Sequence, residues 1–353
     1  MWPKQLRLVI ATFSLLAIAL CSTGVKAQLP SSLDRWLGPQ EWKRDTDGPV
    51  ISLGKEGEFD DTHLLAAMVA KEGDKYFMWY GGSSGFAHDL AGKRLPDKRV
   101  YKLGLATSND GKHFEKHPDG AVFGLNEGTR SVLTPSILRN PDGTLLRVDG
   151  KIRMWFSSAN LGGGGRPHSI QSAESEDGIH WTNVSPDLIT RAYCPTVIKE
   201  GDEYRMWYTE PGAYPWVMRH ARSPDGLNWT VDEKTVIEET QDWEHFVFNY
   251  PTVTKIGDVY LMWYVSYATE DKLTTAIGFA VSEDGLTWHK HPQNPVLRPD
   301  PSREWESHYV SCGSTIRMPD GSFRMWYFAR KEPPFLNLYY ALGTATWAGP
   351  KGL

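Results

Sequence analysis

Cysteine, basic charge and long apolar runs are all scarce in this sequence. Its 353 residues include only 3 Cys, too few for a disulfide framework or a zinc signature. Lys and Arg number 38 against 43 Asp and Glu, a formal net charge of -5, so the chain has no basic footprint for nucleic acid. Beyond one apolar run at residues 8–20, no segment could span a bilayer.

The N-terminus has the pattern of an export signal. Lys4 and Arg7 precede the apolar run, which is short for a membrane span, and small residues follow at Val25 and Ala27. We therefore expect a signal peptide over residues 1–27 and no membrane span after its removal. The mature chain, residues 28–353, is then secreted or periplasmic.

Two cysteines, Cys194 and Cys312, remain in that mature chain. They occupy equivalent places in two of the repeats described below. We interpret them as small buried residues, and a disulfide between them stays open in an oxidising compartment.

Tryptophan, glycine and proline are abundant instead. The chain has 15 Trp, 33 Gly and 23 Pro, and hydrophobic residues make up 40% of it, which is enough for a core. Aromatic residues favour strands, while Gly and Pro favour tight turns. The composition therefore favours short strands joined by turns.

A Met-Trp-aromatic triplet recurs five times, at intervals of roughly 50 to 80 residues, which is typical of propellers, solenoids and arrays. The five copies are Met78-Trp79-Tyr80, Met154-Trp155-Phe156, Met206-Trp207-Tyr208, Met262-Trp263-Tyr264 and Met325-Trp326-Tyr327. An apolar segment and a Gly/Asp turn precede the triplet, as with Pro195-Thr196-Val197 before the third copy. An apolar strand, a turn and an aromatic strand together predict a hairpin.

A second hairpin is predicted after each of the first four triplets. Its turn reads Ser-x-Asp-Gly-x-x-aromatic and occupies residues 108–114, 175–181, 223–229 and 282–288. Asp-Gly supplies the left-handed backbone that a tight turn needs. Each repeat is therefore four strands, which is one propeller blade.

The fifth repeat ends before a fourth strand, and the N-terminus offers one. Trp42 is followed by Pro49 at the same spacing as Pro295 follows Trp288, so we infer that residues 42–53 complete the last blade. The prediction is an all-β, single-domain, five-bladed β-propeller of four-stranded antiparallel blades. Its last blade is closed by the N-terminal strand, which removes exposed sheet edges.

Long and varied connections share one face of such a propeller, whereas the turns on the other face are short and repetitive. The connections lie at residues 83–99, 160–168, 210–216, 267–272 and 330–335. Function concentrates on variable loops held by a rigid scaffold, so we expect the site on this face, at the mouth of the channel. A glycine run at residues 162–165 indicates a mobile loop there.

The repeated Pro-Thr-Val, Met-Trp-Tyr and Ser-x-Asp-Gly-x-x-Trp elements resemble the five-bladed glycosidases: invertases, levansucrases, arabinanases, xylosidases and the related mannoside phosphorylases. The resemblance covers almost the whole mature chain and implies a carbohydrate partner. In invertase-like members, carboxylates precede the Pro of the first three inner strands. Here residues 65–67, 133–135 and 193–195 read Leu-Ala-Ala, Leu-Thr-Pro and Tyr-Cys-Pro, so any such chemistry must use other residues.

Two carboxylates are candidates for that chemistry, since glycoside cleavage usually needs an acid and a base or nucleophile. Asp61 lies where the other repeats carry no acid, and we take it as the base. Glu210 lies where the other repeats have small residues, and we take it as the acid, with a salt bridge as the alternative. Asp60 recurs as Glu244 and Glu306, so it is either a substrate contact or a structural tie for its connection.

Three histidines, His63, His245 and His308, fall in the connections that lead into inner strands. A His can act as general acid or base near neutral pH, so all three are candidate catalytic residues, although each alone is more often structural. Scattered single His residues are weak evidence for a metal site. We predict no required cofactor, and a structural cation in the channel stays open.

Five further residues are candidate substrate contacts at the mouth. Arg130 and Arg191 make the channel mouth partly cationic, which suits an acidic or sulfated sugar. Tyr193 follows Arg191 by two residues. Tyr214 and Trp216 follow Glu210 and can stack on a sugar ring.

The function predicted from these residues is a secreted glycoside hydrolase that acts on poly- or oligosaccharide by acid/base catalysis at the channel mouth. One alternative is a non-catalytic carbohydrate-binding propeller, which the missing carboxylates favour. Another is a His/Tyr-dependent lyase on uronic-acid sugars. Glycan binding without product marks the first alternative, and an unsaturated, ultraviolet-absorbing product marks the second.

Overall fold

The computed structural model describes residues 29–350, except 87–92, 94, 127, 163–167, 273 and 332–340. The signal peptide expected at residues 1–27 and most of the glycine run lie outside the described residues. Among those that are described, no helix is long and apolar enough to cross a membrane.

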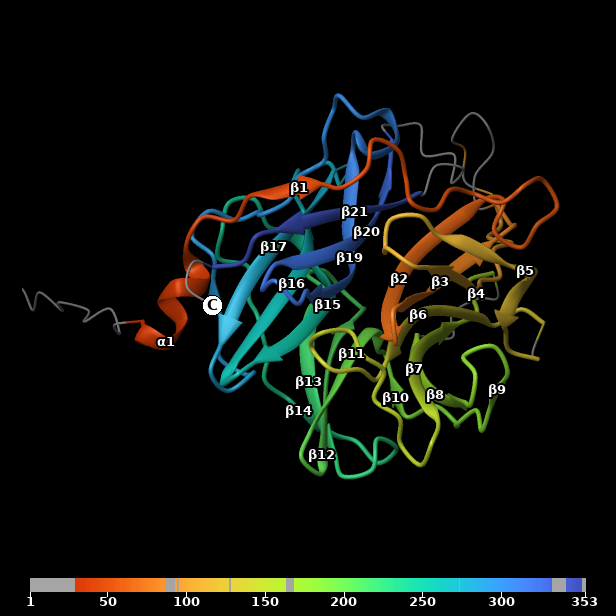
Figure 1. Cartoon of the computed structure of the whole chain (residues 1–353), viewed down its shortest axis with the longest axis horizontal. Helices are drawn as coiled ribbons and strands as arrows, with labels where there is room; N and C mark the ends of the chain where they lie inside the picture. The colour runs from red at the N-terminus through yellow and green to blue at the C-terminus, as the bar shows by residue number, and fades with distance from the viewer. Residues whose placement is uncertain are drawn as a thin grey trace, which may run out of the picture.

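The fold is nearly all β, with 51% strand and 3% helix, and its strands form several antiparallel units (Figure 1). The short helices are α1 (Ser31–Asp34), η1 (Arg35–Leu37) and η2 (Glu304–Glu306). The first unit contains β2 (His63–Glu72), β3 (Lys75–Ser83), β4 (Lys102–Ser108) and β5 (Glu115–Phe123). The second contains β6 (Ser131–Ile137), β7 (Ile152–Ala159), β8 (Ser169–Ser175), β9 (Trp181–Thr182) and β10 (Ile189–Thr190).

The remaining strands follow the same order along the chain. The third unit contains β11 (Tyr193–Glu200), β12 (Glu203–Glu210), β13 (Val217–Ser223) and β14 (Thr230–Asp232). The fourth contains β15 (His245–Ile256), β16 (Val259–Tyr267), β17 (Thr275–Ser282) and β18 (His289–Lys290). The last contains β19 (Tyr309–Arg317), β20 (Phe323–Arg330), β21 (Ala341–Trp347) and β1 (Trp42–Arg44).

The strand β1, from the start of the chain, is the fourth strand of the last unit. It pairs antiparallel with β21, with Trp42 opposite Trp347. Its Arg44 also reaches Glu306 of the same unit, at 3.1 Å. The expected pairing of an N-terminal strand with the last repeat is therefore confirmed, and it covers an edge that would otherwise be open.

The first strand of each unit faces a common centre (Figure 1). β2 contacts β6, and the contacts continue through β11, β15 and β19 back to β2. All five strands have a register shift against their hairpin partners. At three of these shifts Ala66, Cys194 and Tyr250 adopt a left-handed backbone, so the bulge re-aims the side chains around it.

The Met-Trp-aromatic triplets lie in the second strand of every unit, and their five Trp side chains are fully buried. Four of these Trp residues donate Nε1–H to the glycine carbonyl of a Ser-x-Asp-Gly turn in the next unit. Trp79 reaches Gly178 at 2.9 Å, and Trp326 of the last unit reaches Gly111 of the first, also at 2.9 Å. The two motifs therefore fasten neighbouring units, including the last to the first.

The exception among the five is Trp263. It faces the last unit, whose sequence has no Ser-x-Asp-Gly turn. Its Nε1 is buried without a hydrogen-bond partner in the described part of the chain. Because the last unit has no Ser-x-Asp-Gly turn, Trp263 lacks the glycine carbonyl that the other four Trp residues use.

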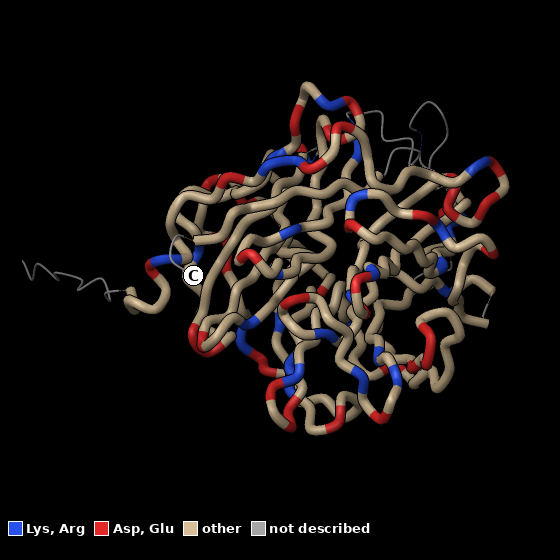
Figure 2. The backbone as a smooth tube through the Cα atoms, in the orientation of Figure 1, with Lys and Arg blue, Asp and Glu red and all other residues tan. Residues whose placement is uncertain are grey.

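Acidic and basic residues are interspersed along the loops and turns (Figure 2). Cys194 and Cys312 are buried free thiols. The interpretation of both as small buried residues agrees with these positions.

Candidate active site

Most of the expected site residues lie at matching ends of the strands. His63, Tyr193 and His245 are the first residues of β2, β11 and β15, and Glu210 is the last residue of β12. The start of one strand lies beside the end of its antiparallel partner, and Tyr193 is paired with Thr209, next to Glu210. These residues therefore lie at the same end of their sheets.

The carboxylate of Glu210 lies between two guanidinium groups. Its Oε1 is 3.0 Å from Arg191 Nη2, and its Oε2 accepts a hydrogen bond from Arg219 Nε at 2.6 Å. The Glu210 side chain is 23% exposed, whereas that of Arg191 is 62% exposed. The salt bridge that was the structural alternative for Glu210 is present, and a ligand can displace the exposed Arg191 from it.

An aromatic group follows Glu210 in the same connection. The rings of Tyr214 and Trp216 stack, with centroids 6.0 Å apart and planes at 11°. Lys272 Nζ lies 3.8 Å from the centroid of the Tyr214 ring and 4.2 Å from that of Phe246. Tyr214 is more than half exposed, so this edge presents aromatic rings together with a cation.

Two tyrosines and a histidine lie closer to the centre. The hydroxyl groups of Tyr193 and Tyr250 are 2.8 Å apart, and the ring of His168 is 4.5 Å from that of Tyr193. Burial lowers the pKa of His168 to about 4 and raises the pKa of Tyr193 well above its usual value. All three groups are therefore uncharged near neutral pH.

The buried His63 forms a second histidine–tyrosine pair. Its Nδ1 is 2.8 Å from the hydroxyl of Tyr101. Arg99 lies 6.0 Å from the Tyr101 ring centroid and is held by two hydrogen bonds to Asp97, at 2.9 and 2.6 Å. The Arg99–Asp97 ion pair therefore lies beside the histidine and tyrosine.

Asp60, Glu244 and Glu306 share one internal arrangement. Each accepts a hydrogen bond from the Tyr of its own triplet: Tyr80 at 3.0 Å, Tyr264 at 2.7 Å and Tyr327 at 2.5 Å. Each also pairs with a cation from the fourth strand of its unit: Lys116 at 2.6 Å, Lys290 at 2.5 Å and Arg44 at 3.1 Å. Asp60 is 1% exposed, and these contacts tie its connection to the sheet.

The half-buried Asp61 holds the adjacent loop. Its Oδ2 accepts a hydrogen bond from the backbone N–H of Gly57, and its Oδ1 accepts one from the Thr62 hydroxyl, both at 2.8 Å. One lone pair on each oxygen remains for another donor.

Arg130 is buried at the start of β6. It donates to Ser158 Oγ from Nε at 3.1 Å and from Nη2 at 2.7 Å, and it pairs with Asp187. The structure therefore places this guanidinium in a network within its own unit.

His245 and His308 are both half-buried. The backbone N–H of His245 donates to Ser266 Oγ at 3.0 Å, and its ring lies 6.1 Å from that of Phe246. His308 follows η2, and its backbone N–H donates to the carbonyl of Arg330 at 3.3 Å. Neither contact brings the imidazole to a carboxylate.

The structure brings two pairs of expected residues together: Arg191 with Glu210, and Tyr214 with Trp216. In the part of the chain that is described, no cluster of three or more His, Cys, Asp or Glu residues could hold a metal ion.

Four residues of this region were not expected from the sequence: Tyr101, His168, Arg219 and Tyr250. Arg219 could have been found, because the β12–β13 hairpin register places it opposite Tyr208, near Glu210. Tyr250 precedes Pro251 as Cys194 precedes Pro195, which predicts its place but not its partner. Nothing in the repeat pattern signals Tyr101 or His168, since both belong to irregular connections.

Comparison with known proteins gives relatives without an assigned role and structures with a shared fold. No protein-family model matches the chain. Two uncharacterized proteins of Mycobacterium tuberculosis, from strains CDC 1551 / Oshkosh and ATCC 25618 / H37Rv, are each 29% identical over 250 residues. The match covers 67% of this chain and 77% of each relative.

Solved structures with the same fold include carbohydrate-active enzymes. A glycoside hydrolase is 18% identical with a TM-score of 0.68, over 85% of this chain and 91% of that one. A protein from the GH130 family of mannoside phosphorylases is 14% identical with a TM-score of 0.66, over 87% and 93%. An N-acetylgalactosamine deacetylase from F. plautii is 15% identical with a TM-score of 0.65, over 86% and 95%.

At such identities the likeness establishes the fold and leaves the chemistry open, as the deacetylase among these neighbours illustrates. The chain therefore shares an all-β fold with glycoside hydrolase-like proteins of the propeller type.

Proposed function

We propose that this chain is a glycoside hydrolase with a five-bladed propeller fold closed by β1. Its substrate is a poly- or oligosaccharide that binds at the end of the sheets carrying Glu210. The arrangement of the inner strands and the glycoside hydrolase-like neighbours support this assignment. As a secreted or periplasmic protein, it would meet its substrate outside the cytoplasm.

The observation that carries the proposal is the cluster around Glu210. A carboxylate held by two guanidinium groups is followed, in one connection, by the stacked rings of Tyr214 and Trp216. Sites for small molecules combine apolar and aromatic surface with a few placed polar groups. Sugar rings offer an apolar face and polar edges, so this combination suits them.

The catalytic roles follow from which groups a substrate can reach. Asp61 serves as base, because each of its oxygens has a lone pair left. Glu210 serves as acid after Arg191 and Arg219 have turned to the substrate and the carboxylate has taken up a proton, and His63, His245 and His308 remain candidates for proton transfer. Arg191, Tyr193 and the Tyr214–Trp216 stack position the sugar, while Arg130 and Asp60 hold their own parts of the fold in place.

The test is a screen of the mature chain against plant and algal oligosaccharides, with products identified by mass spectrometry. Products that together contain one added water establish hydrolysis. Glu210→Gln should then lower kcat by about 100-fold or more, as expected for loss of a general acid. Glu203→Gln is the matched control, because Glu203 is exposed at the opposite end of the same strand.

Either of two results contradicts the proposal. Binding without product supports a carbohydrate-binding protein, and full activity of Glu210→Gln removes that residue from the mechanism. Asp61→Asn should abolish turnover with unfolding unchanged, and retained turnover removes Asp61 in the same way.

A second candidate function is a lyase on uronic-acid sugars, which the His63–Tyr101 and Tyr193–Tyr250 pairs favour. Elimination needs a base for the proton beside the carboxylate and an acid for the leaving oxygen, and His and Tyr serve both roles. The nearby guanidinium groups of Arg99 and Arg191 suit an acidic sugar. An ultraviolet-absorbing product without added water would select this function over hydrolysis.

A further inference from the structure

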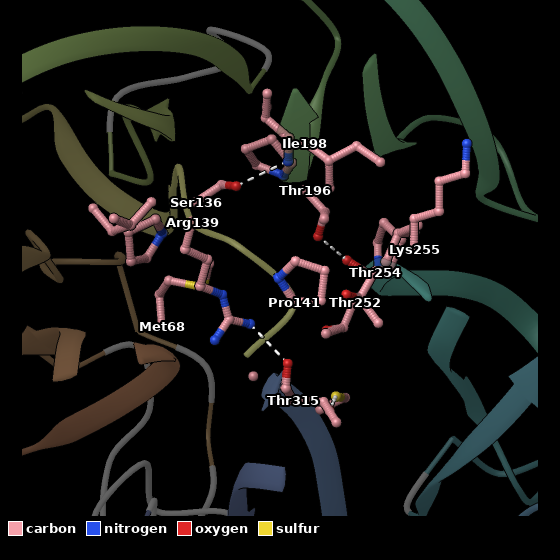
Figure 3. Close-up of a pocket in the computed structure, with 18 of the residues that line it drawn as sticks. Met68, Ser136, Arg139, Pro141, Thr196, Ile198, Thr252, Thr254, Lys255 and Thr315 are labelled. Atoms are coloured by element: carbon pink, nitrogen blue, oxygen red, sulfur yellow. Dashed lines mark hydrogen bonds between the residues drawn. The ribbon is translucent and has the colours of Figure 1, made fainter. Parts of the chain in front are cut away.

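A central cavity of about 330 Å³ lies between the five inner strands (Figure 3), and its lining includes Tyr250 of the site described above. Every inner strand contributes to its lining, for example Met68 of β2, Ser136 of β6 and Thr315 of β19. The lining also reaches the exposed turn residue Gly257, so the cavity meets the surface at the ends of the strands opposite Glu210.

Arg139 extends into this cavity from just beyond the end of β6 (Figure 3). Its guanidinium donates to the backbone carbonyls of Val69 in β2, at 2.5 Å, and of Thr315 in β19, at 2.9 Å. A guanidinium has five N–H donors, so these two bonds leave others to be satisfied.

The charge of Arg139 has no carboxylate within 4 Å in the described ranges, since its contacts there are the two carbonyls. Burial lowers its pKa to about 10, which leaves it charged near neutral pH. Arg139 is half-buried, and Asp142, the carboxylate whose charge acts on it, makes no ion pair with it. A partly desolvated charge without an ion-pair partner is unfavourable. The cavity therefore favours an ion of opposite sign.

The other charged residues of the lining hold their charges outside the centre of the cavity. Lys199 Nζ donates to the carbonyl of Gly201 at 2.8 Å, and Lys255 Nζ pairs with Glu200. Glu200 is already paired with Lys255 at 2.7 Å and with Arg205 at 3.3 Å. Glu200 is thus occupied by other cations and does not neutralise Arg139.

The opposite wall supplies hydroxyl groups. Thr252 and Thr254 lie on alternate positions of β15, line the cavity and are each 7% exposed. Hydroxyls turn their hydrogen toward whichever acceptor is present, so they can donate to an anion.

We propose that the central cavity binds a small inorganic anion, held by the Arg139 guanidinium with hydroxyl donors from β15. The anion neutralises Arg139, which joins the first inner strand to the last. It therefore stabilises the closed arrangement of units and takes no part in the chemistry at the Glu210 end.

Thermal unfolding of the mature chain tests the proposal, with chloride, sulfate and phosphate titrated separately at constant ionic strength against a large organic anion. An anion that binds only the folded state raises Tm along a saturable curve. We expect such a curve for at least one of the three anions, and the comparison identifies which. A response that grows without saturation, as salting-out does, would contradict the proposal.

Two variants separate binding from general salt effects. Arg139→Met should weaken the apparent affinity about tenfold or more, because it removes the charged donor. Arg147→Met is the matched control, since Arg147 lies in the same turn but pairs with Glu72 outside the cavity. Equal affinity in wild type and Arg139→Met would overturn the assignment.

A crystallographic measurement on the wild-type protein covers the case in which Arg139→Met fails to fold. Crystals grown with bromide or selenate should show an anomalous peak within hydrogen-bonding distance of Arg139. A cavity that contains only water under both conditions would refute the proposal.

Discussion

At the scale of single residues, the repeated motifs form hydrogen bonds between neighbouring units. The Trp of each triplet is fixed by a glycine carbonyl that belongs to the neighbouring unit, and the exception, Trp263, faces the unit without that glycine. This contrast provides an internal control, because both kinds of Trp are fully buried in the same strand position.

Replacing Trp155 by Phe should destabilise the protein by about 1 kcal/mol more than the same change at Trp263. Trp155 Nε1 donates to Gly226 at 2.8 Å, whereas Trp263 Nε1 makes no such bond within the described residues. Urea unfolding of both variants and the wild type measures the difference. Equal losses for the two variants would mean that packing alone determines the cost.

A second residue-scale prediction concerns acid sensitivity through His220. The imidazole is buried, its Nδ1 is 2.6 Å from Asp232 Oδ2, and its Nε2 accepts a hydrogen bond from Arg205 at 3.1 Å, an arrangement of the neutral ring. Burial lowers the pKa of His220 to about 4 from 6.5. The unfolded chain therefore binds more protons between these values, and stability falls as pH falls from about 6.5 to about 4.

His220→Gln should remove part of that dependence, on the order of 2 kcal/mol across the interval. The free energy of unfolding, measured in urea at several pH values, gives the slope for variant and wild type. His289→Gln, a half-buried His of β18, is the control and should keep the wild-type slope. An unchanged slope in His220→Gln would assign the acid sensitivity to other groups.

At the scale of elements, β1 acts as a replacement for the strand that the last repeat lacks. Its Arg44 takes the place held by Lys116 and Lys290 in other units, and it pairs with the buried Glu306. A segment from one end of the chain thus supplies both a strand and a counter-charge to the other end.

Arg44→Met should destabilise the protein by about 2 kcal/mol, because it removes one partner of a fully buried carboxylate. Arg303, the other cation at Glu306, limits the loss. Lys43→Met is the matched control, since Lys43 is exposed in the same strand, and its effect should be within about 0.5 kcal/mol. Chemical denaturation of both variants provides the comparison, and similar losses would contradict a role for the Arg44–Glu306 pair.

The long turn after β6 is a second closing element, at the ends of the inner strands. Its Gly143 carbonyl accepts from the N–H of Lys71 at 2.6 Å, and its Pro141 carbonyl accepts from the N–H of Arg317 at 2.9 Å. These bonds join the ends of β2 and β19. These contacts depend on how the units are arranged and could not be inferred locally from the sequence.

The β class, the hairpins and the N-terminal strand could be predicted from the sequence, because each leaves a periodic signal in it. The triplets, the Asp-Gly turns and the spacing after Trp42 repeat whatever the tertiary contacts are. The site was harder to predict, since it depends on contacts between irregular connections, such as Glu210 with Arg191 or His63 with Tyr101. Recurrence did help with Asp60, whose copies at 244 and 306 share its internal pairing.

At the scale of the whole molecule, each unit is fastened to the next, and the last is fastened to the first. Open repeat arrays have terminal repeats that unfold separately, whereas a closed ring has none. The chain should therefore unfold in a single transition. Tryptophan fluorescence and far-ultraviolet circular dichroism should give coincident urea curves, and separated curves would show that units unfold independently.

The pairing of β1 with β21 also determines when the first strand can join its sheet during synthesis. A chain made from its N-terminus produces β1 first and the partner of β1 last. Until residue 347 has left the ribosome, the first strand has no partner strand to pair with. Premature stop codons anywhere upstream would therefore leave open edges at both ends, so proteases can distinguish an incomplete product from a finished one by its unpaired strands.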